Sequence, residues 1–294
     1  MFEQLGLIGC GLMGGSFALA LKQAGLVQRV VGYSKSPSTT DRARQLGVID
    51  VEAPSALLAV AGADIVLLAV PVSATEATLK AIRHLVTPQM LIMDVGSTKA
   101  DVVQAAESAL REKVGSFVPA HPITGREVSG VEHAEADLYS GRQVILTPTE
   151  RTYTAQLQRA QEVWTLLGSR VTRMSPESHD AAFAAVSHLP HLTAFALINS
   201  ILHQDAASDT LALGGSGFRD FTRIAASDPA MWRDIFLCNR EEILLQTDLL
   251  IDALHTFARA MEANDGEQLH ALITQASNVR SQWRMTTKDD NARL

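Results

Sequence analysis

Short apolar runs alternate with amphipathic stretches through the first 174 residues of the chain. Each run is apolar throughout rather than alternating with polar residues, which is typical of strands buried on both faces of a parallel sheet. The pattern therefore predicts an α/β domain with a doubly wound, mostly parallel sheet that is covered by helices. We expect its strands at residues 5–8, 29–33, 65–70, 90–95, 117–120, 144–147 and 170–174.

The pattern changes after residue 174 and becomes helical almost throughout. Ser175 followed by Pro176 is typical of a helix start, because serine caps free N–H groups and proline fits the first turn. Further helices are expected from Asp228 and from Asp265. Several helices carry apolar residues on more than one face, which indicates burial in a core or in a subunit interface. We therefore predict two domains: an α/β domain at 1–174 and an all-α domain at 175–294.

A glycine-rich turn joins the first predicted strand to the first predicted helix. Its GxGxxG spacing, between a strand and a helix, predicts a Rossmann-type domain that binds a dinucleotide. Gly9 permits the tight turn, Gly11 lets the backbone approach a pyrophosphate, and Gly14 lets the helix pack closely on the strand. The alternative is a turn that needs glycine for backbone reasons alone. The expected cofactor-binding residues here and after the strand at 65–70 are Gly9, Gly11, Leu12, Met13, Gly14, Val70 and Pro71.

The end of the second predicted strand indicates which cofactor binds. Folds that prefer NAD usually place an acidic residue there, which holds the ribose 2′-hydroxyl. This chain has Ser34 and Lys35 at that place, and the first acid beyond them is Asp41. A hydroxyl and a cation suit a 2′-phosphate, so we expect Ser34 and Lys35 to bind the cofactor and NADP to be favoured over NAD. An ordinary surface lysine is the alternative for Lys35.

Polar residues of the first domain gather after its later predicted strands, where ligands bind in open α/β sheets. Ser97 and Lys99 follow one strand, and His121 and Arg126 follow the next. A histidine at such an edge can accept a proton in catalysis, and a structural histidine is the alternative. Lys99 and Arg126 would give this edge positive charge.

The helical domain carries a second set of polar residues. His188 and His191 are three residues apart and share a helix face, next to Pro190, which would kink that helix. The two histidines could ligate a metal, but no acidic residue completes a zinc motif, and we expect no metal. Asp220 and Arg223 are also three apart. They could form a structural ion pair, or Asp220 could orient Arg223 toward a substrate carboxylate.

Composition narrows the classes of function. The chain has 294 residues, 47% of them hydrophobic and 19% charged, which is typical of a well-packed globular protein with room for two domains. A formal net charge of −7 argues against nucleic-acid binding. Cys10 and Cys238 form no metal or redox motif, and no signal-peptide pattern or apolar run near the roughly 20 residues that cross a bilayer is present. We therefore expect a cytoplasmic protein with no membrane contact.

Taken in order, the motifs of both domains resemble those of the prephenate/arogenate dehydrogenase family of tyrosine biosynthesis. The resemblance covers nearly the whole chain. It rests on GxGxxG at 9–14, GSTK at 96–99, HPITGREVSG at 121–130, SHLPH at 187–191 and DFTRIA at 220–225, followed by Asp228, Pro229 and Trp232. It implies a Rossmann domain and a helical domain through which the protein forms a homodimer, with the active site between the two.

The resemblance also implies a reaction. The family oxidises the hydroxyl-bearing carbon of a cyclohexadienyl ring by hydride transfer to NAD(P), while the opposite carboxylate leaves as CO2 and the ring becomes a phenol. His121 would accept the hydroxyl proton, and Ser97 would be hydrogen-bonded near the same hydroxyl and the nicotinamide. Because the acceptor must be neutral, we expect the rate to rise with pH through a group near histidine's usual pKa.

The substrate side of the implied site is less completely specified. Arg223, oriented by Asp220, would bind a substrate carboxylate. The remaining substrate-binding residues implied are His191, His188, Trp232, Arg126 and Glu127. Prephenate and arogenate differ only in a keto or an amino group. We favour prephenate, and Glu127 is a candidate partner for the ammonium of arogenate, so arogenate dehydrogenation and dual specificity stay open.

Two other interpretations start from the same architecture. A β-hydroxyacid dehydrogenase has a similar architecture, but that class uses a lysine on the first long helix after the Rossmann domain, and residues 177–202 contain none. The alternative from a different class is a non-catalytic NADP-sensing protein built on the same fold.

Overall fold

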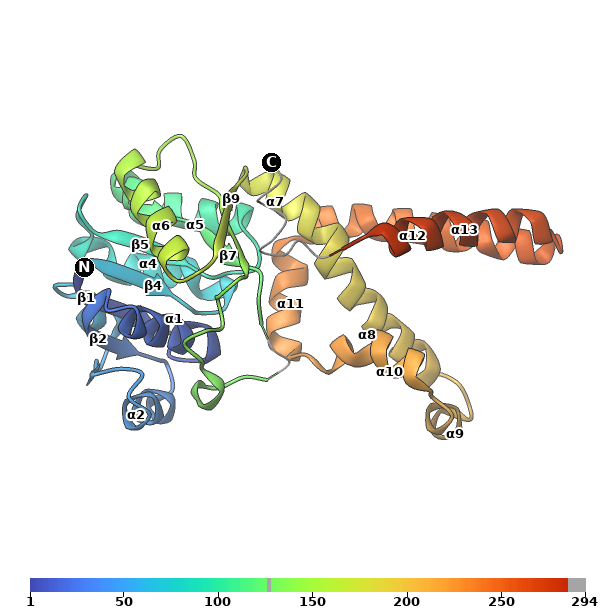
Figure 1. Ribbon diagram of the computed structural model, residues 1–294, viewed down its shortest axis with the longest axis horizontal. Coiled ribbons are helices and arrows are strands. Elements are labelled where there is room, and N and C mark those ends of the chain that lie inside the picture. The colour runs from blue at the N-terminus through green and yellow to red at the C-terminus, as the bar shows by residue number, and fades with distance from the viewer. Residues whose placement is uncertain (126–127, 285–294) are drawn as a thin grey trace. The chain divides into compact units, whose positions relative to one another are not determined.

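The structure, a computed structural model, describes residues 1–125 and 128–284 (Figure 1). Contacts between residues divide the chain into two compact units, 1–240 and 241–294. The first unit combines the sheets with the helices that follow them up to Arg240. The boundary near residue 174 marks the change from sheet to helix, and as a domain boundary it stays a prediction.

The first unit is organised around a parallel sheet of six strands in the order β3-β2-β1-β4-β5-β6. The Rossmann-type sheet is thus confirmed. Because the chain turns from one side of β1 to the other, the carboxyl ends of β1 and β4 flank the crevice where such sheets bind ligands. The strands are β1 (Phe2–Ile8), β2 (Val27–Tyr33), β3 (Val51–Glu52), β4 (Ile65–Leu68), β5 (Leu91–Asp94) and β6 (Phe117–Val118).

A smaller sheet of three strands follows, in which β8 (Gln143–Leu146) pairs antiparallel with β7 (Ala120–Pro122) and parallel with β9 (Arg170–Arg173). The single strand expected at 117–120 is in fact split between the two sheets. Pro119 lies at the break, where a residue without an N–H group interrupts the ladder. His121 therefore lies within β7, opposite Ile145, rather than beyond a strand end.

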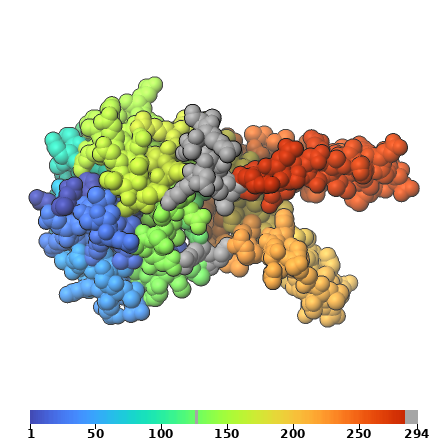
Figure 2. All heavy atoms as spheres, in the orientation of Figure 1, coloured from blue at the N-terminus to red at the C-terminus, as the bar shows by residue number. Residues whose placement is uncertain are grey.

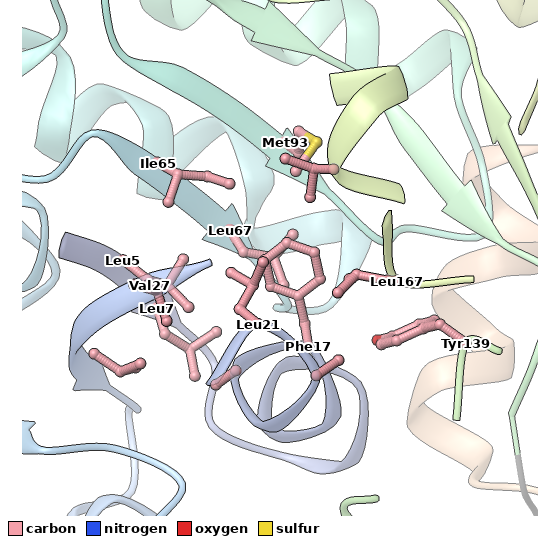
Figure 3. Close-up of a cluster of buried hydrophobic side chains, with 14 of the residues drawn as sticks. Leu5, Leu7, Phe17, Leu21, Val27, Ile65, Leu67, Met93, Tyr139 and Leu167 are labelled. Atoms are coloured by element: carbon pink, nitrogen blue, oxygen red, sulfur yellow. The ribbon is translucent and has the colours of Figure 1, made fainter. Parts of the chain in front are cut away.

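Helices cover both faces of the larger sheet and bury two apolar clusters. Figure 3 shows part of one of them, where Phe17 and Leu21 of α1 approach Leu67 of β4. Tyr139 packs near Phe17 and donates a hydrogen bond from Oη to the carbonyl of Met13 (2.6 Å), which ties the loop after β7 to the glycine turn. The helices are α1 (Leu12–Gln23), α2 (Pro37–Gln45), α3 (Ala56–Val60), α4 (Thr75–Ile82), α5 (Ala100–Leu110) and α6 (Thr154–Leu166).

The helical part of the first unit begins as expected, because the Ser175 side chain accepts a hydrogen bond from the Ser178 N–H (3.1 Å) and caps α7. A π-helical turn, Ala184–His188, then precedes Pro190. Proline cannot donate to the carbonyl four residues earlier, and a wider turn accommodates the missing bond. The remaining helices are α7 (Pro176–Phe183), α8 (Leu189–Leu202), α9 (Ala207–Ala212), α10 (Ser216–Thr222) and α11 (Pro229–Cys238).

The second unit consists of most of α12 (Arg240–Glu262) and of α13 (Gly266–Gln282), which are coloured orange to red in Figures 1 and 2. The Asp265 side chain caps α13 by accepting from the Gln268 N–H (2.9 Å), as expected. Many apolar side chains of this unit are exposed in the single chain. They include Leu244, Leu245, Leu249, Ile251, Leu254, Met261, Ile273 and Val279.

One long helical segment, Pro176–Leu202, is long and apolar enough to cross a membrane by length and composition, with a mean hydropathy of 1.5 and 17% of that stretch buried. The sequence-based expectation concerned uninterrupted apolar runs, and a helix in the core of a protein outside the membrane can have the same length and composition. The same helical segment also carries His179, Asp180 and His188. Those polar residues form part of the site described next.

Candidate active site

The glycine turn after β1 has the geometry of a dinucleotide cradle. Gly9 has φ +97°, a left-handed conformation that favours glycine. A Cβ atom on Gly14 would lie 2.0 Å from the Gly9 carbonyl oxygen, so only glycine lets α1 pack this closely. Gly11 caps α1 without a side-chain hydrogen bond, and no atom lies within 4 Å of where its Cβ would be. Open space beside free N–H groups at a helix start suits a pyrophosphate.

The other expected cofactor residues are placed around this turn. Leu12 is buried in the core, and Met13 offers its carbonyl to Tyr139, so these two residues present backbone rather than side chains. Val70 and Pro71 follow the end of β4 after Ala69, with Pro71 exposed. Together with the glycines they line the carboxyl ends of β1 and β4, so the residues present fit a dinucleotide.

The end of β2 carries no carboxylate. The Ser34 hydroxyl accepts a hydrogen bond from the Cys10 N–H (2.8 Å) and so helps to hold the glycine turn. Lys35 is exposed. The nearest acid in sequence, Asp41, accepts from the Gln45 side chain within α2 (2.8 Å). A hydroxyl and an exposed cation therefore flank the place where an NAD-preferring fold has an acid.

A buried ion pair closes the end of β5. The Lys99 ammonium donates to Asp94 Oδ2 (2.5 Å) and to the Ala120 carbonyl (2.9 Å), while the Ala120 N–H donates to Asp94 Oδ1 (2.9 Å). Both side chains are almost inaccessible to solvent. The cation expected at the edge of the sheet is thus buried and already paired. The Lys99–Asp94 pair fixes Ala120, the residue before His121, against the end of β5. The sequence did not reveal this contact.

His121 is joined to two residues of α7. One ring nitrogen of His121, Nδ1, lies 2.8 Å from Nε2 of His179. The other nitrogen of His179, Nδ1, lies 2.7 Å from Asp180 Oδ1. Asp180 and His179 are fully buried, whereas His121 is partly exposed. A carboxylate, a buried imidazole and a partly exposed imidazole therefore form one hydrogen-bonded chain.

The surroundings keep these histidines neutral. Burial, followed by the electrostatic effects of His179, Lys99 and His188, lowers the pKa of His121 well below 6.5. Burial also lowers the pKa of His179, although the Asp180 carboxylate opposes the shift. Desolvation disfavours the charged imidazolium in each case. The sequence-based expectation of a titration near histidine's usual pKa is corrected accordingly, because the group that titrates in the folded protein does so at lower pH.

A second histidine cluster surrounds Trp232. The His191 ring stacks on the indole of Trp232, with 3.6 Å between centroids, and the His191 Nδ1–H donates to the Ser187 carbonyl (2.9 Å). His188 meets the same indole edge-on. Burial lowers the pKa of His188 to about 4, so His188 is neutral at pH 7. The π-helical turn and Pro190 bring both histidines onto Trp232, an aromatic platform.

The hydrogen bond with Asn239 determines which nitrogen of His188 carries the proton. The Asn239 amide donates to the Asp180 carbonyl (2.8 Å) and lies 3.1 Å from His188 Nδ1. An amide N–H makes Nδ1 the acceptor, so the proton of neutral His188 lies on Nε2. That nitrogen is buried without a hydrogen-bond partner among the described residues, as is the indole N–H of Trp232. Two buried donors thus remain for a ligand or water.

The expected pairing of Asp220 with Arg223 is not formed. Asp220 accepts instead from its neighbour Arg219 (3.1 Å), and both of these side chains are exposed. Adjacent residues on a helix surface can pair without constraint, whereas Arg223 begins the 3-10 turn Arg223–Ala226 that follows α10. Asp220 therefore does not orient Arg223. Arg126 and Glu127 lie outside the described residues.

Several site residues had no clear signal in the sequence. Lys99 lies in the GSTK segment, where the sequence predicts a cation at the edge of the sheet, and the sequence pattern assigns His179 no role. Asp180 and Asn239 were missed. The adjacent pair His179–Asp180 near the start of α7 was the one sequence feature that could have indicated these residues. Its significance depends on a contact with His121, which lies 58 positions away from His179.

Comparisons with known proteins agree with this geometry. Two family models match the chain. One, described as the nucleotide-binding domain of prephenate dehydrogenase, matches residues 17–173, and the other, described as its dimerization domain, matches residues 175–275.

Individual relatives extend the match to nearly the full chain. A prephenate dehydrogenase of Bacillus subtilis is 36% identical over 282 residues, covering 95% of this chain and 76% of that protein. A cyclohexadienyl dehydrogenase of Zymomonas mobilis is 35% identical over 282 residues, covering 95% of this chain and 96% of that protein. The crystal structure of Aquifex aeolicus prephenate dehydrogenase with hydroxyphenyl propionate and NAD+ matches with a TM-score of 0.89 and 36% identity, over 96% of this chain and 98% of that one.

Proposed function

The chain belongs to the prephenate dehydrogenase family, and from this premise we propose that it converts prephenate to 4-hydroxyphenylpyruvate and CO2, with the hydride passing to NADP or NAD. Its relatives are prephenate and cyclohexadienyl dehydrogenases, and the chain is an NAD(P)-dependent oxidoreductase of this kind. The observation that carries the proposal is the neutral, partly exposed His121 at the end of a buried chain of hydrogen bonds.

His121 is the proposed proton acceptor. As the substrate's ring carbon loses its hydride and gains carbonyl character, its hydroxyl must lose a proton, and a neutral imidazole can take it. The bound nicotinamide supplies the hydride acceptor. Ser97, which follows β5 and is partly exposed, is proposed to hydrogen-bond near the same hydroxyl. Loss of CO2 then needs no further acid or base from the protein, because the ring becomes aromatic as the carboxylate leaves.

Substrate binding is assigned to the residues around Trp232 and to Arg223. His188 can donate from Nε2, and the stacked rings of His191 and Trp232 offer an aromatic surface against which the substrate ring can pack. Arg223 is exposed on the turn after α10 and is proposed to bind a substrate carboxylate without help from Asp220. A guanidinium matches a carboxylate in shape and in charge. Arg126 is proposed as an additional cation near the substrate.

The cofactor is proposed to be NADP in preference to NAD. The support is the end of β2, where Ser34 and exposed Lys35 stand in place of an acid. A carboxylate there would repel the 2′-phosphate, and a lysine attracts it. The Aquifex relative was solved with NAD+, so the preference has to be measured for this chain.

Prephenate is proposed over arogenate as the substrate. The carboxylates that act on the buried histidines are those of Asp180 and Asp94, and hydrogen bonds already occupy both of them. Neither carboxylate is therefore available to the ammonium group of arogenate. Glu127 is the remaining candidate for that role, and arogenate or dual use is the second candidate function, favoured by the cyclohexadienyl relative.

The helical region is proposed to form a homodimer in the cytoplasm. Support comes from the match to a dimerization domain at residues 175–275 and from the apolar side chains that α8, α12 and α13 expose in the single chain. Large apolar side chains that are exposed in this number on a helix pair are typical of an interaction site. Sedimentation of the full chain tests the assembly, and a monomer at micromolar concentration would contradict it.

The test of function is an initial-rate assay with prephenate and arogenate, each combined with NAD and NADP, following the reduced nicotinamide. We expect the highest kcat/KM with prephenate and NADP. A higher value with arogenate would overturn the substrate assignment, and a preference for NAD would overturn the assignment of Ser34 and Lys35. Cofactor binding without turnover in all four combinations would overturn catalysis and favour an NADP sensor.

A further inference from the structure

We propose that Asp180 and His179 are positioning residues that hold His121 in a single tautomer, with its proton on Nδ1 and its lone pair on Nε2. The inference rests on the proposed function, in which His121 is the base. It adds which nitrogen of His121 accepts the proton and which residues decide it. The argument follows the hydrogen bonds from the buried end of the chain outward.

The Asp180 carboxylate is fixed as an acceptor. Its Oδ1 accepts from the Lys99 N–H and its Oδ2 from the Ala100 N–H, both at 2.8 Å. These are free N–H groups at the start of α5, where the helix dipole also favours negative charge. A protonated carboxyl would turn a donor toward one of these N–H groups. Asp180 is therefore ionised, and a nitrogen 2.7 Å from its Oδ1 must carry a proton.

That requirement sets the tautomer of His179. Its Nδ1 is the nitrogen that faces Asp180, so Nδ1 is protonated. Burial keeps His179 neutral, which leaves it one proton only. Its Nε2 consequently carries a lone pair and can only accept. The Asp180 carboxylate thus makes Nε2 of His179, the nitrogen that faces His121, a hydrogen-bond acceptor.

The tautomer of His121 follows in the same way. His121 Nδ1 lies 2.8 Å from the accepting Nε2 of His179, so it must donate, and the lone pair of neutral His121 lies on Nε2. The opposite tautomer would set two lone pairs against each other in a buried place, where an unmade hydrogen bond is unfavourable. His179 occupies the Nδ1 side of the His121 ring, so Nε2 is the nitrogen left to accept a proton.

Other groups around His121 act on its charge rather than on its tautomer. The Phe183 ring packs 4.8 Å from the His121 ring and stacks on His179 at 4.5 Å, so both rings are held in place. Lys99, paired with Asp94, disfavours a second positive charge nearby. The titratable and charged groups that face the pair of rings from the packed elements are His188, Lys99, Asp94 and Asp180.

The arrangement also accounts for the proton that catalysis releases. When Nε2 takes the proton of the substrate hydroxyl, the O–H bond breaks, an N–H bond forms, and His121 becomes an imidazolium. Its Nδ1–H stays bonded to His179, whose far side faces the Asp180 carboxylate. A carboxylate at the end of such a chain stabilises the cation without itself taking the proton. His179 and Asp180 touch neither substrate nor cofactor in this scheme.

The first test reads the tautomer directly, without turnover. The full chain is labelled with ¹⁵N-histidine, and two-bond ¹⁵N–¹H correlations are recorded at pH 7.5 in the absence of substrate. Spectra of His121→Asn and His179→Gln assign the two residues. We expect a protonated Nδ1 and an unprotonated Nε2 for His121. A protonated Nε2 would overturn the proposal, even if the protein turns over prephenate.

The second test separates positioning from folding. His179→Phe keeps a ring in the aromatic stack but removes the acceptor, and we expect kcat to fall by a factor on the order of 10²–10⁴ with KM little changed. His179→Gln retains an oxygen that can accept from His121 Nδ1, and we expect it to recover most of that loss. The matched control is His84→Phe, which alters an exposed histidine away from the site and is expected to leave kcat unchanged.

The outcomes are distinguishable. Equal kcat in His179→Phe and the wild-type protein would overturn the positioning role, and so would equal losses in His179→Phe and His179→Gln with unchanged cofactor affinity. Asp180→Asn carries an amide that can present a donor to His179, and we expect it to shift the His121 proton to Nε2 in the ¹⁵N spectrum. If His121→Asn keeps the wild-type rate while the spectrum shows the expected tautomer, the proposed function fails and the hydrogen-bonded chain stands.

Discussion

The glycine turn after β1 and the histidine chain of β7 and α7 illustrate two ways of building a site. The turn consists of backbone from six successive residues, and its properties come from φ angles and the absence of side chains. The histidine chain consists of side chains that are far apart in sequence, and its properties come from burial and hydrogen bonds. A local site tolerates changes elsewhere in the protein, whereas the histidine chain depends on how a strand and a helix pack.

The two regions also respond differently to charge. The glycine turn has no ionisable group except the buried thiol of Cys10, whose pKa burial raises to about 11. The histidine region holds an ion pair, a carboxylate and three histidines whose pKa values burial lowers. Changes of pH should therefore affect the histidine region and leave the turn unaltered.

The largest effect is expected from His121→Asn, which removes the proposed base and leaves the turn intact. We expect kcat to fall by a factor on the order of 10²–10⁴, the usual contribution of a general base. The dissociation constant of NADPH, measured by fluorescence titration, should stay the same. A loss of less than about tenfold in kcat would show that another group takes the proton.

Acid should destabilise the protein through its buried histidines. A histidine whose pKa is lower in the folded than in the unfolded state stabilises the fold above pH 6.5, and this stabilisation is lost as pH falls toward the folded-state pKa. For His188, with a folded pKa of about 4, the loss by pH 4 is on the order of 3 kcal/mol.

Urea unfolding at a series of pH values from 7 to 4 measures this loss. The matched variant is His188→Gln, which cannot titrate, and its free energy of unfolding should depend less steeply on pH than that of the wild-type protein. The same slope in both proteins would assign the acid sensitivity to other groups.

Gly14→Ala should damage the turn and spare the histidine chain. The added methyl would overlap the Gly9 carbonyl oxygen, so α1 must move, at a cost of about 1–3 kcal/mol in the free energy of unfolding. Gly11→Ala is the matched control, since nothing lies near its Cβ position. We expect wild-type thermal stability from Gly11→Ala but weaker cofactor binding, by about tenfold, or about 1.4 kcal/mol. Unchanged affinity in Gly11→Ala would contradict the placement of the pyrophosphate.

Lys35→Ala should change the choice of cofactor only. Losing one exposed cation beside a phosphate should raise the KM for NADP by about tenfold at low salt and leave the KM for NAD unaltered. Lys80→Ala, at an exposed lysine on α4 that pairs with Glu76, is the control for loss of a charge. Equal effects on both cofactors would mean that Lys35 does not contact the 2′-phosphate.

The smallest effect is expected in the pH dependence of the rate above pH 6.5. Since burial, His179 and Lys99 hold the pKa of His121 well below 6.5, kcat/KM should change by less than about twofold between pH 6.5 and 8. The decline should begin only at lower pH. A steady rise from pH 6.5 to 8 would mean that the titrating group has an ordinary histidine pKa.

The glycine turn and the histidine chain also differ in how far the sequence pattern could predict them. Most strands, the GxGxxG turn and the caps at Ser175, Asp228 and Asp265 were predicted correctly, because each depends on residues close together in sequence. The short strand β3 and the division of residues 117–120 between two sheets were not predicted. The pairing of Asp220 with Arg223 was also inferred from residues close together in sequence, and it is not formed. Spacing made the pair possible, but Arg219 lies nearer and the helix ends before Arg223.

The sequence by itself determined the sheet, the cofactor turn and which histidines were candidates for chemistry, since periodicity and glycine spacing act over a few residues. Only the tertiary structure decided that Lys99 is buried against Asp94, that His179 and Asp180 stand behind His121, and that Asn239 orients His188. Burial and hydrogen-bond partners set the protonation state of an imidazole, and these partners come from β5, β7, α7 and the end of α11. Their packing brings together groups that no local pattern connects.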